Sequence, residues 1–448
     1  MPNKIIFKKK IENFNKKISI PGDKSLSIRW VLISSLSKGI STAQNLLMSK
    51  DVLAAIQTVK KLGVKVVFNN QTCKIFGVGI NGYKYKKNIV INAKNSGTLG
   101  RLILGLLIDA PVPIKMIGDK SLSKRDFKRI ADPLSKFGAT FKLNKNYGLP
   151  LIIKGSKKLK PINFYENRGS AQCKSSVILA GIKTNGKTII KAKKSRNHTE
   201  LLLKHLKLPI KIKSKKNFDL IEINKVKKIN PINYRMPSDI SSSAFFIALT
   251  VLSKKSQLTI RDVNINPSRV GMLTILKKMG VKISFEKKRI YNGEPIANVI
   301  VKSPKILKSL NCPSKLNSSA IDEFLVIFLI AAKAKGVSFF KNLEELNKKE
   351  SPRLDIAVKF LRMIGIKVIR KKDSIKIFGN PKLRLSKKYH VKNFLKDHRI
   401  FMLSVIAALT LGGKWKINDR NAINSSFPTF LKISKELGGK INWEETIL

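Results

Sequence analysis

The residues best suited to chemistry in this 448-residue chain are basic side chains placed where helices are expected to begin. The stretch PGDKSLSIR, residues 21–29, puts Lys24, Ser25 and Arg29 directly after a turn-forming Pro-Gly-Asp. We expect a helix from Ser27 onward, with Lys24 and Ser25 at its start. Backbone amides at a helix N-terminus attract anions, and Lys and Arg side chains add full positive charges. The pattern favours a bound phosphate or carboxylate.

Three further stretches of the first half repeat this arrangement. In NSGTLGRLILGLL a small polar turn opens an apolar helix, and Gly97 allows a ligand to approach the backbone closely. GDKSLSKRDFKRI places Arg125 just inside another expected helix. RGSAQCKSSVILAGI places Ser170, Ala171 and Gln172 at the start of a third. Anion-binding or hydrogen-bonding groups therefore recur at helix starts in this half of the chain.

The second half supplies an acid, a base and more cations. AIDEFLVIFLIAAKAKG sets Asp322 ahead of an apolar helix, and DHRIFMLSVIAALTLGG sets Arg399 at the start of another. ELNKKESPRLDIA gathers Lys349, Glu350 and Arg353 before a helix. Carboxylates and amines can transfer protons, and arginines suit carboxylate or phosphate groups. We expect basic groups from both halves to bind one multiply charged ligand.

Six helix–strand repeats are expected to position these residues. A helical pattern ends at a Gly and is followed at once by an alternating strand pattern at Gly63, Gly138, Gly280, Gly365 and Gly438. Gly tolerates the left-handed conformation that ends many helices. LLLKHLKLPIKIKSKK, from Leu201, fills the long gap between the second and third of these without a Gly. We predict three α/β units in each of two domains, central helices buried among sheets, and a boundary near residues 230–239.

Composition and charge narrow the classes of function. The net charge of +63 is typical of nucleic-acid binding, but the lysines are spread along the whole chain and only 7% of residues are aromatic. We therefore interpret the charge as compositional drift that still favours small anionic ligands. The three Cys and four His show no metal-binding spacing, so neither a metal site nor a disulfide framework is expected. No export signal and no apolar run of about 18 residues is present, which predicts a soluble chain.

Taken together, the stretches resemble one family. In the family order, the chain carries matches to the EPSP synthase (3-phosphoshikimate 1-carboxyvinyltransferase) motifs P-G-D-K-S-x-S-x-R, N-x-G-T, G-D-x-S-L-x-x-R, S-A-Q-x-K-S, D-E-x-P, K-E-S-D-R and D-H-R-x-A-M. The resemblance implies an α/β (α+β), two-domain, enolpyruvyl transferase-like fold, with three βαβαββ units per domain. It assigns residues 21–235 to an N-terminal domain on the shikimate 3-phosphate side, and residues 1–20 plus 236–448 to a C-terminal domain. The active site is expected in the cleft between them.

The resemblance also implies a reaction. The family transfers the enolpyruvyl group of phosphoenolpyruvate to the 5-hydroxyl of shikimate 3-phosphate and releases phosphate, within aromatic amino acid biosynthesis. It requires no metal and no organic cofactor. We expect a cytoplasmic monomer whose partners are these two small molecules, with no nucleic acid and no membrane.

Site residues carry over by matching position. For shikimate 3-phosphate the resemblance indicates Lys24, Ser25, Arg29, Ser170, Ala171, Gln172, Arg196, Asp322 and Lys349. For phosphoenolpyruvate it indicates Lys24, Gly97, Arg125, Gln172, Arg353 and Arg399. The catalytic candidates are Lys24, Asp322, Lys349 and Glu350. Asp322 is the candidate base for the 5-hydroxyl, whereas Lys349 and Glu350 are both candidates for moving the carbon proton, and the sequence leaves the choice between them open.

The chain departs from the family motifs at several positions. Ile28 replaces the usual His, and Asp126 stands where Pro is usual. The Pro usual after the Asp-Glu is replaced by Phe324 or by the adjacent Leu325, Asn347 replaces Arg, and Pro352 replaces Asp. None of these is a residue assigned to chemistry. Pro352 has the largest expected consequence, because it fixes φ and removes a backbone donor beside a predicted ligand.

Two alternatives stay open. A UDP-N-acetylglucosamine enolpyruvyl transferase shares the fold and phosphoenolpyruvate, but it carries a Lys-Asn pair and usually a mobile-loop Cys. Here Lys24 is followed by Ser25, and no Cys lies between Cys73 and Cys173. The alternative from another class is a basic nucleic-acid-binding protein, which salt-dependent retention of DNA without phosphate release would support.

Overall fold

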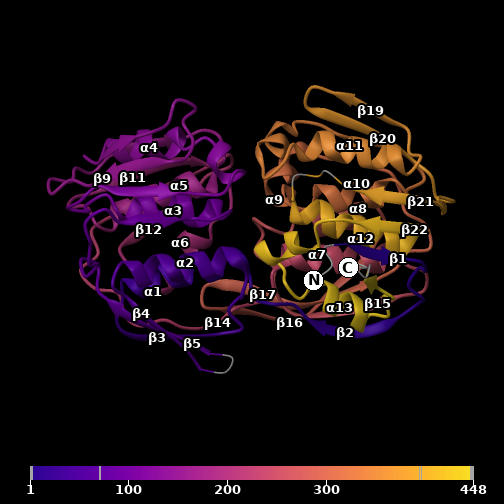
Figure 1. Cartoon of the computed structure of the whole chain (residues 1–448), viewed down its shortest axis with the longest axis horizontal. Coiled ribbons are helices and arrows are strands. Elements are labelled where there is room, and N and C mark those ends of the chain that lie inside the picture. The colour runs from indigo at the N-terminus through magenta and orange to yellow at the C-terminus, as the bar shows by residue number, and fades with distance from the viewer. Residues whose placement is uncertain (1–3, 70–71, 393, 395, 444–448) are drawn as a thin grey trace, which may run out of the picture. The chain divides into compact units, whose positions relative to one another are not determined.

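The computed structural model describes residues 4–69, 72–392, 394 and 396–443, and the chain divides into two compact units (Figure 1). Unit 1 comprises Met1–Pro21, Ser238–Arg289 and Pro295–Leu448. Unit 2 comprises Gly22–Pro237 and the short segment Ile290–Glu294. The chain therefore passes between units at each of these junctions, directly before the PGDKSLSIR helix and again before the helix that follows Ser238.

Unit 2 contains three four-stranded sheets that share one topology. The first has the order β14 (Asn233–Arg235), β3 (Lys38–Gln44), β5 (Thr72–Val78), β4 (Lys65–Asn69). The second is β6 (Val90–Asn92), β7 (Ile114–Ile117), β9 (Leu151–Lys154), β8 (Thr140–Lys142), and the third is β10 (Asn163–Glu166), β11 (Thr188–Lys193), β13 (Phe218–Ile223), β12 (Ile210–Ser214). In each, the first strand is parallel to the second and the remaining pairs are antiparallel.

Each sheet of unit 2 is associated with one central and one outer helix. The central helices are α1 (Lys24–Ser35), α3 (Gly97–Leu106) and α5 (Ala171–Gly181), and the outer helices are α2 (Lys50–Lys61), α4 (Lys128–Ser135) and α6 (His198–His205). α3 packs against both α1 and α5. The central helices bury side chains on every face, because they carry apolar or small residues all round.

Unit 1 also contains three sheets, and two of them include a strand from the N-terminal segment of the chain. Its sheets have the orders β16 (Lys282–Tyr291), β17 (Glu294–Lys302), β15 (Gln257–Asn264), β2 (Asn15–Ser19); β18 (Gly336–Phe340), β20 (Ser374–Gly379), β19 (Val368–Lys371); and β21 (Leu385–Val391), β22 (Gly412–Ile417), β1 (Ile5–Phe7), β23 (Asn442–Trp443). β2 is parallel to β15 and β1 is antiparallel to β22. The N-terminal strands therefore complete two sheets of the C-terminal half.

The helices of unit 1 follow the same division. The central helices are α7 (Ile240–Leu252), α10 (Phe324–Ala331) and α12 (His398–Leu411), and the outer helices are α8 (Gly271–Lys278), α11 (Arg353–Met363) and α13 (Phe430–Glu436). A one-turn helix, α9 (Asn317–Ala320), and the 3-10 turns η1 (Leu122–Lys124), η2 (Ser314–Leu316), η3 (Glu344–Lys348) and η4 (Arg420–Ser425) complete the elements. Among the described residues, no helix combines the length and apolar character that a membrane span requires.

The glycines that end the repeated helices have the predicted conformation. Gly63, Gly138, Gly280, Gly365 and Gly438 all have positive φ, between +81° and +116°. The repeat that lacks a Gly has Lys207 in the corresponding position after α6, with φ of +54°. A side chain with a Cβ is strained in this left-handed region, so Lys207 is a local cost to the fold.

Replacing Lys207 by Gly is therefore expected to stabilise the protein. Removing the Cβ relieves about 1 kcal/mol of left-handed strain, partly offset by the greater freedom of Gly in the unfolded chain. We expect a small rise in the urea midpoint of unfolding. Lys204→Gly, within α6, is the matched control and should lower the midpoint, because Gly costs about 1 kcal/mol inside a helix. A lower midpoint for Lys207→Gly would contradict the argument.

Candidate active site

The first candidate group lies at the N-terminus of α1. The Asp23 carboxylate accepts a hydrogen bond from the Leu26 amide at 2.9 Å, and this cap starts the helix at Lys24. The expectation that the helix begins at Ser27 was therefore wrong by three residues. Lys24 Nζ lies 2.9 Å from Oδ2 of Asp51, in the first turn of α2. Asp51 is thus the ion-pair partner of a candidate residue, and no pattern in the sequence indicated this pairing.

Arg29 is buried one turn further along α1. Its guanidinium donates to the Ser25 carbonyl at 3.0 Å, to Thr199 Oγ1 at 2.8 Å and to Ser175 Oγ at 3.2 Å. Thr199 is in α6 and Ser175 is in α5, so Arg29 joins three helices. All of these acceptors are neutral, and the positive charge of Arg29 is therefore not cancelled by them.

A second group links α3, α5 and the loop before α4. A Cβ on Gly97 would lie only 2.8 Å from Nη1 of Arg125, so the guanidinium of Arg125 lies directly against the start of α3. Gln172, in the first turn of α5, donates to Thr98 Oγ1 at 3.1 Å and accepts from Nη1 of Arg101. The predicted residues Gly97, Arg125 and Gln172 are therefore brought together within unit 2.

Arg101 is a member of this group that the sequence analysis did not identify. Burial, and then the nearby charge of Arg125, lower its pKa to about 10, and the charge of Arg129 acts in the same direction. The available signal was its spacing, because residue 101 is four positions after Gly97 and so lies on the same face of the helix. Its presence makes this part of unit 2 strongly electropositive.

Two further first-half residues, Ser170 and Ala171, lie at a helix start, and two, Arg125 and Arg196, lie before a helix. Ser170 is the N-cap of α5 and its Oγ accepts from the Cys173 amide at 3.3 Å, with Ala171 as the first helical residue. Arg196 is in the loop before α6. Arg125 was expected just inside a helix, but it ends η1, and α4 begins only at Lys128.

The candidate residues of the second half gather around one carboxylate in unit 1. Oδ1 of Asp322 lies 3.6 Å from Lys349 Nζ and 3.6 Å from Arg353 Nη1. Arg399 donates from Nη1 to the Asp322 carbonyl at 2.8 Å, and its Nη2 lies 4.0 Å from Oδ2. Glu350 completes the group through an ion pair with Arg353.

Arg353 is the most buried member, with 1% of its side chain exposed. Besides Glu350 and Asp322, it pairs with Asp397, whose Oδ2 lies 2.9 Å from Nε. Burial would lower the pKa of Arg353, but the carboxylates of Asp397 and Glu350 outweigh it and raise the pKa. Arg353 therefore stays charged and holds the acidic groups in place.

Asp397 is another residue that was not assigned a role from the sequence. It is the N-cap of α12, it accepts from the Arg399 amide at 2.9 Å, and it accepts from Ser351 Oγ at 2.7 Å. Burial would raise its pKa, but Arg353 and then His398 lower it overall. The sequence pattern that could have indicated this role is the Asp-His-Arg start of an apolar helix, because Asp is a common N-cap residue.

These contacts divide the candidate residues into one group per unit. Unit 2 holds Lys24, Ser25, Arg29, Gly97, Arg125, Ser170, Ala171, Gln172 and Arg196. Unit 1 holds Asp322, Lys349, Glu350, Arg353 and Arg399. The first group offers cations and helix N-termini, which suit anion binding, and the second adds carboxylates and an amine, which can transfer protons.

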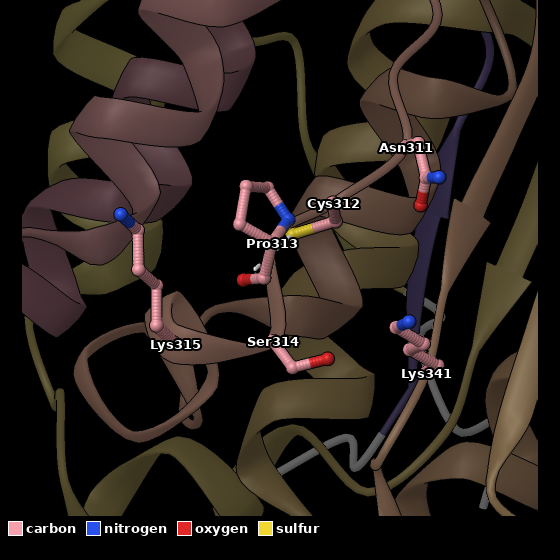
Figure 2. A pocket seen from close by; sticks show the side chains of 6 residues that line it. All are labelled: Asn311, Cys312, Pro313, Ser314, Lys315 and Lys341. Atoms are coloured by element: carbon pink, nitrogen blue, oxygen red, sulfur yellow. Dashed lines mark hydrogen bonds between the residues drawn. The ribbon is translucent and has the colours of Figure 1, made fainter.

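A hollow elsewhere in unit 1 involves none of these residues. Figure 2 shows it, with a volume of about 500 Å³ and a lining of Asn311, Cys312, Pro313, Ser314, Lys315 and Lys341. Cys312 is buried, which raises the pKa of its thiol to about 11. Across the described parts of the chain, no group of His, Cys, Asp and Glu is arranged to hold a metal ion.

Comparison with known proteins identifies the family. The family model described as EPSP synthase (3-phosphoshikimate 1-carboxyvinyltransferase) matches residues 8–433. The chain belongs to the EPSP synthase family. A 3-phosphoshikimate 1-carboxyvinyltransferase of Vesicomyosocius okutanii subsp. Calyptogena okutanii (strain HA) is 37% identical over 426 residues, covering 95% of this chain and 96% of the relative. One of Caldicellulosiruptor bescii is 37% identical over 421 residues, covering 94% and 96%.

Solved structures agree with the family. The EPSP synthase of Acinetobacter baumannii has a TM-score of 0.87 and 32% identity, covering 99% of this chain and 100% of that one. The enolpyruvyl transferase NikO of Streptomyces tendae, at 14% identity, has a TM-score of 0.76 and shows the fold alone. The predicted two-domain α/β fold of enolpyruvyl transferase type is confirmed.

Two departures from the EPSP synthase motifs are residues of hydrophobic cores. Ile28 and Phe324 are both fully buried, Ile28 in the core of unit 2 and Phe324 in the core of unit 1. Phe324 is the first residue of α10 and its ring packs against those of Phe328 and Phe340. Neither side chain therefore offers a polar group to the candidate site.

The departures at 126 and 352 are compatible with the helices they precede. Asp126 Oδ1 accepts from the Lys128 amide at 2.8 Å and so caps the start of α4. Pro352 is the N-cap of α11 with φ of −70°, a value that proline adopts without strain. Because the residue at this position precedes the helix, its missing N–H costs no intrahelical hydrogen bond.

Proposed function

We propose that this member of the EPSP synthase family transfers the enolpyruvyl group of phosphoenolpyruvate to the 5-hydroxyl of shikimate 3-phosphate and releases phosphate. The observation that carries the proposal is the cluster around Asp322, where Lys349, Arg353 and Arg399 approach one carboxylate and Glu350 pairs with Arg353. Relatives that share more than a third of their residues over nearly the whole chain carry the name of this activity. These relatives and the cluster support the same reaction.

The residues of unit 2 are proposed to bind the anionic groups of the substrates. Shikimate 3-phosphate is assigned to Lys24, Ser25, Arg29, Ser170, Ala171, Gln172 and Arg196, together with Asp322 and Lys349 of unit 1. Phosphoenolpyruvate is assigned to Lys24, Gly97, Arg125, Gln172, Arg353 and Arg399. Guanidinium groups and helix N-termini favour phosphate and carboxylate oxygens, and the electropositive surroundings of Arg101 support this assignment.

The proposed chemistry needs two proton transfers that reverse each other. A proton adds to the methylene carbon of phosphoenolpyruvate while the 5-hydroxyl oxygen attacks the adjacent carbon and loses its own proton. The methyl carbon then returns a proton as the carbon–oxygen bond to phosphate breaks, which restores the double bond. Asp322 is proposed to accept the hydroxyl proton, and Lys349 and Glu350 are proposed to move the carbon proton.

The location, the oligomeric state and the cofactor requirement of the protein stay predictions. Cytoplasmic location, a monomeric state and independence from metals and organic cofactors each follow from the family resemblance. Light scattering of the purified protein would test the monomer, and activity after exhaustive dialysis against a chelator would test the independence from metals.

Phosphate release from phosphoenolpyruvate is the direct test. We expect release with purified protein only when shikimate 3-phosphate is present, and none when UDP-N-acetylglucosamine replaces it. Release that depends on the sugar nucleotide would support the related enolpyruvyl transferase instead. Salt-sensitive retention on DNA without any phosphate release would favour the nucleic-acid alternative.

A further inference from the structure

The loop that carries Lys349 and Glu350 runs into a helix that lacks the usual cap. α11 begins at Arg353, and Pro352 at its N-cap makes no side-chain hydrogen bond to the helix. The first amides of an α-helix have no acceptor within the helix, and an N-cap Asp, Asn, Ser or Thr normally accepts one of them. The family motif K-E-S-D-R has an Asp at this position, so this chain has lost a capping group.

Asn347, which precedes the loop of residues 348–352, supplies a hydrogen-bond acceptor for the first amides of α11. Its Oδ1 accepts from the Leu354 amide at 3.0 Å and from the Asp355 amide at 3.4 Å. Its Nδ2 donates to Oδ2 of Asp355 at 2.9 Å. The side chain of a residue six positions before the helix therefore does the work of an N-cap.

The remaining amides of the first turn are satisfied locally. The Arg353 amide donates to the Ser351 carbonyl at 2.8 Å, and the Ile356 amide donates to the Pro352 carbonyl at 3.0 Å. With the two amides held by Asn347, every amide from 353 to 356 has an acceptor. The two departures from the motif, at 347 and 352, thus compensate each other.

We propose that Asn347 is a positioning residue of the proposed active site. By capping α11 it closes the loop of residues 348–352 at both ends and fixes Lys349 and Glu350 relative to Arg353. The inference rests on the proposed function, since the placement of these groups matters for a proton transfer at this cluster. Lys349 and Arg353 both approach the same oxygen of Asp322 at 3.6 Å, so a shift of the loop would change the geometry of the whole cluster.

The first test is the Asn347→Ala variant. Removing the cap is expected to lower kcat between about tenfold and a hundredfold, as small displacements of catalytic groups do. The KM for shikimate 3-phosphate should stay within about threefold, because most of its proposed contacts lie in other segments. The control is Asn380→Ala, which removes a similar hydrogen bond, donated by the Lys382 amide to Asn380 Oδ1 in the same unit, and should leave kcat unchanged. Equal effects of the two variants would overturn the proposal.

A double-mutant cycle tests the compensation itself. Pro352→Asp restores a capping side chain, so Asn347→Ala should cost less than about threefold in kcat in that background. A purely structural role elsewhere would cost the same in both backgrounds. Additive effects of the two substitutions would therefore contradict the proposal.

Hydrogen exchange separates this inference from the proposed function. In Asn347→Ala the amides of Leu354 and Asp355 should exchange faster, and those of α12 should not change. Unchanged exchange at 354 and 355 would overturn the proposal whatever the activity. If the unmodified protein releases no phosphate, the proposed function fails, while the exchange measurement still decides whether Asn347 caps α11.

Discussion

Lys24→Ala is expected to reduce kcat/KM for the proposed reaction by about a hundredfold to a thousandfold, the usual effect of removing one preorganised charged donor. Lys24 is the first residue of α1, where the helix dipole and the side-chain charge would both attract the proposed anionic substrate. It is also the residue proposed to reach both substrates. Steady-state phosphate release at varied concentrations of each substrate measures the effect.

Asp51→Asn is the matched control for Lys24→Ala. Both variants break the ion pair between Lys24 Nζ and Asp51, but only Lys24→Ala removes the cation. If Lys24 binds substrate, the loss of activity should be much larger for Lys24→Ala than for Asp51→Asn. Similar losses would mean that the ion pair between α1 and α2 matters and that Lys24 has only a structural role.

The repeated architecture was readable from the sequence because its signals are local. A helix that ends in the left-handed conformation needs Gly, and the alternation that follows it depends on neighbouring residues alone. The helix end at Lys207 could not be predicted in this way, because a Lys in the left-handed conformation cannot be distinguished in the sequence from any other Lys. Burial of the central helices was equally local, because α10 is apolar from Phe324 to Ala331 without interruption.

Strand pairing between distant segments was not readable in the same way. β2 pairs in register with β15, more than 200 residues later, and no local pattern specifies that partner. The same holds for the segment Ile290–Glu294, which comprises the end of β16, the turn after it and the first residue of β17, and which groups with unit 2. There Glu294 lies 2.6 Å from Nδ1 of His198 and both side chains are buried. Only the folded chain shows that this turn belongs with α6.

The candidate site shows the same difference between features with a local sequence signal and contacts between distant segments. The helix starts were predicted from Ser, Gly, Asp and basic residues, which are N-cap and anion-binding signals. The partners that hold the functional groups, Asp51 for Lys24 and Asp397 for Arg353, come from separate segments and required the structure. Asn347 is the reverse case, because a departure from the motif became interpretable only when its hydrogen bonds were known.

Arg353→Ala is expected to have the largest effect on stability, lowering the free energy of unfolding by about 3–5 kcal/mol, because it leaves buried carboxylates without their counter-charge. Arg353 is 1% exposed and Asp397 is fully buried. Arg353→Lys should recover little of the loss, since an ammonium cannot reproduce the planar fork that contacts several carboxylates. Arg289→Ala is the control, because its pair with Asp262 is largely exposed and such pairs contribute within about 1 kcal/mol.

The loss of stability in Arg353→Ala should also depend on pH in a defined direction. In the unmodified protein the folded-state pKa of Asp397 lies below its ordinary value of 3.8, so the stability from this group is present above that pH and is lost as pH falls through the lower folded value. Without Arg353, burial instead raises the pKa of Asp397, and protonation then favours the folded state. The difference in urea midpoint between Arg353→Ala and the unmodified protein should therefore be largest near neutral pH and should shrink on acidification. A difference that is independent of pH would show that the stabilising contacts of Arg353 do not include the Asp397 carboxylate.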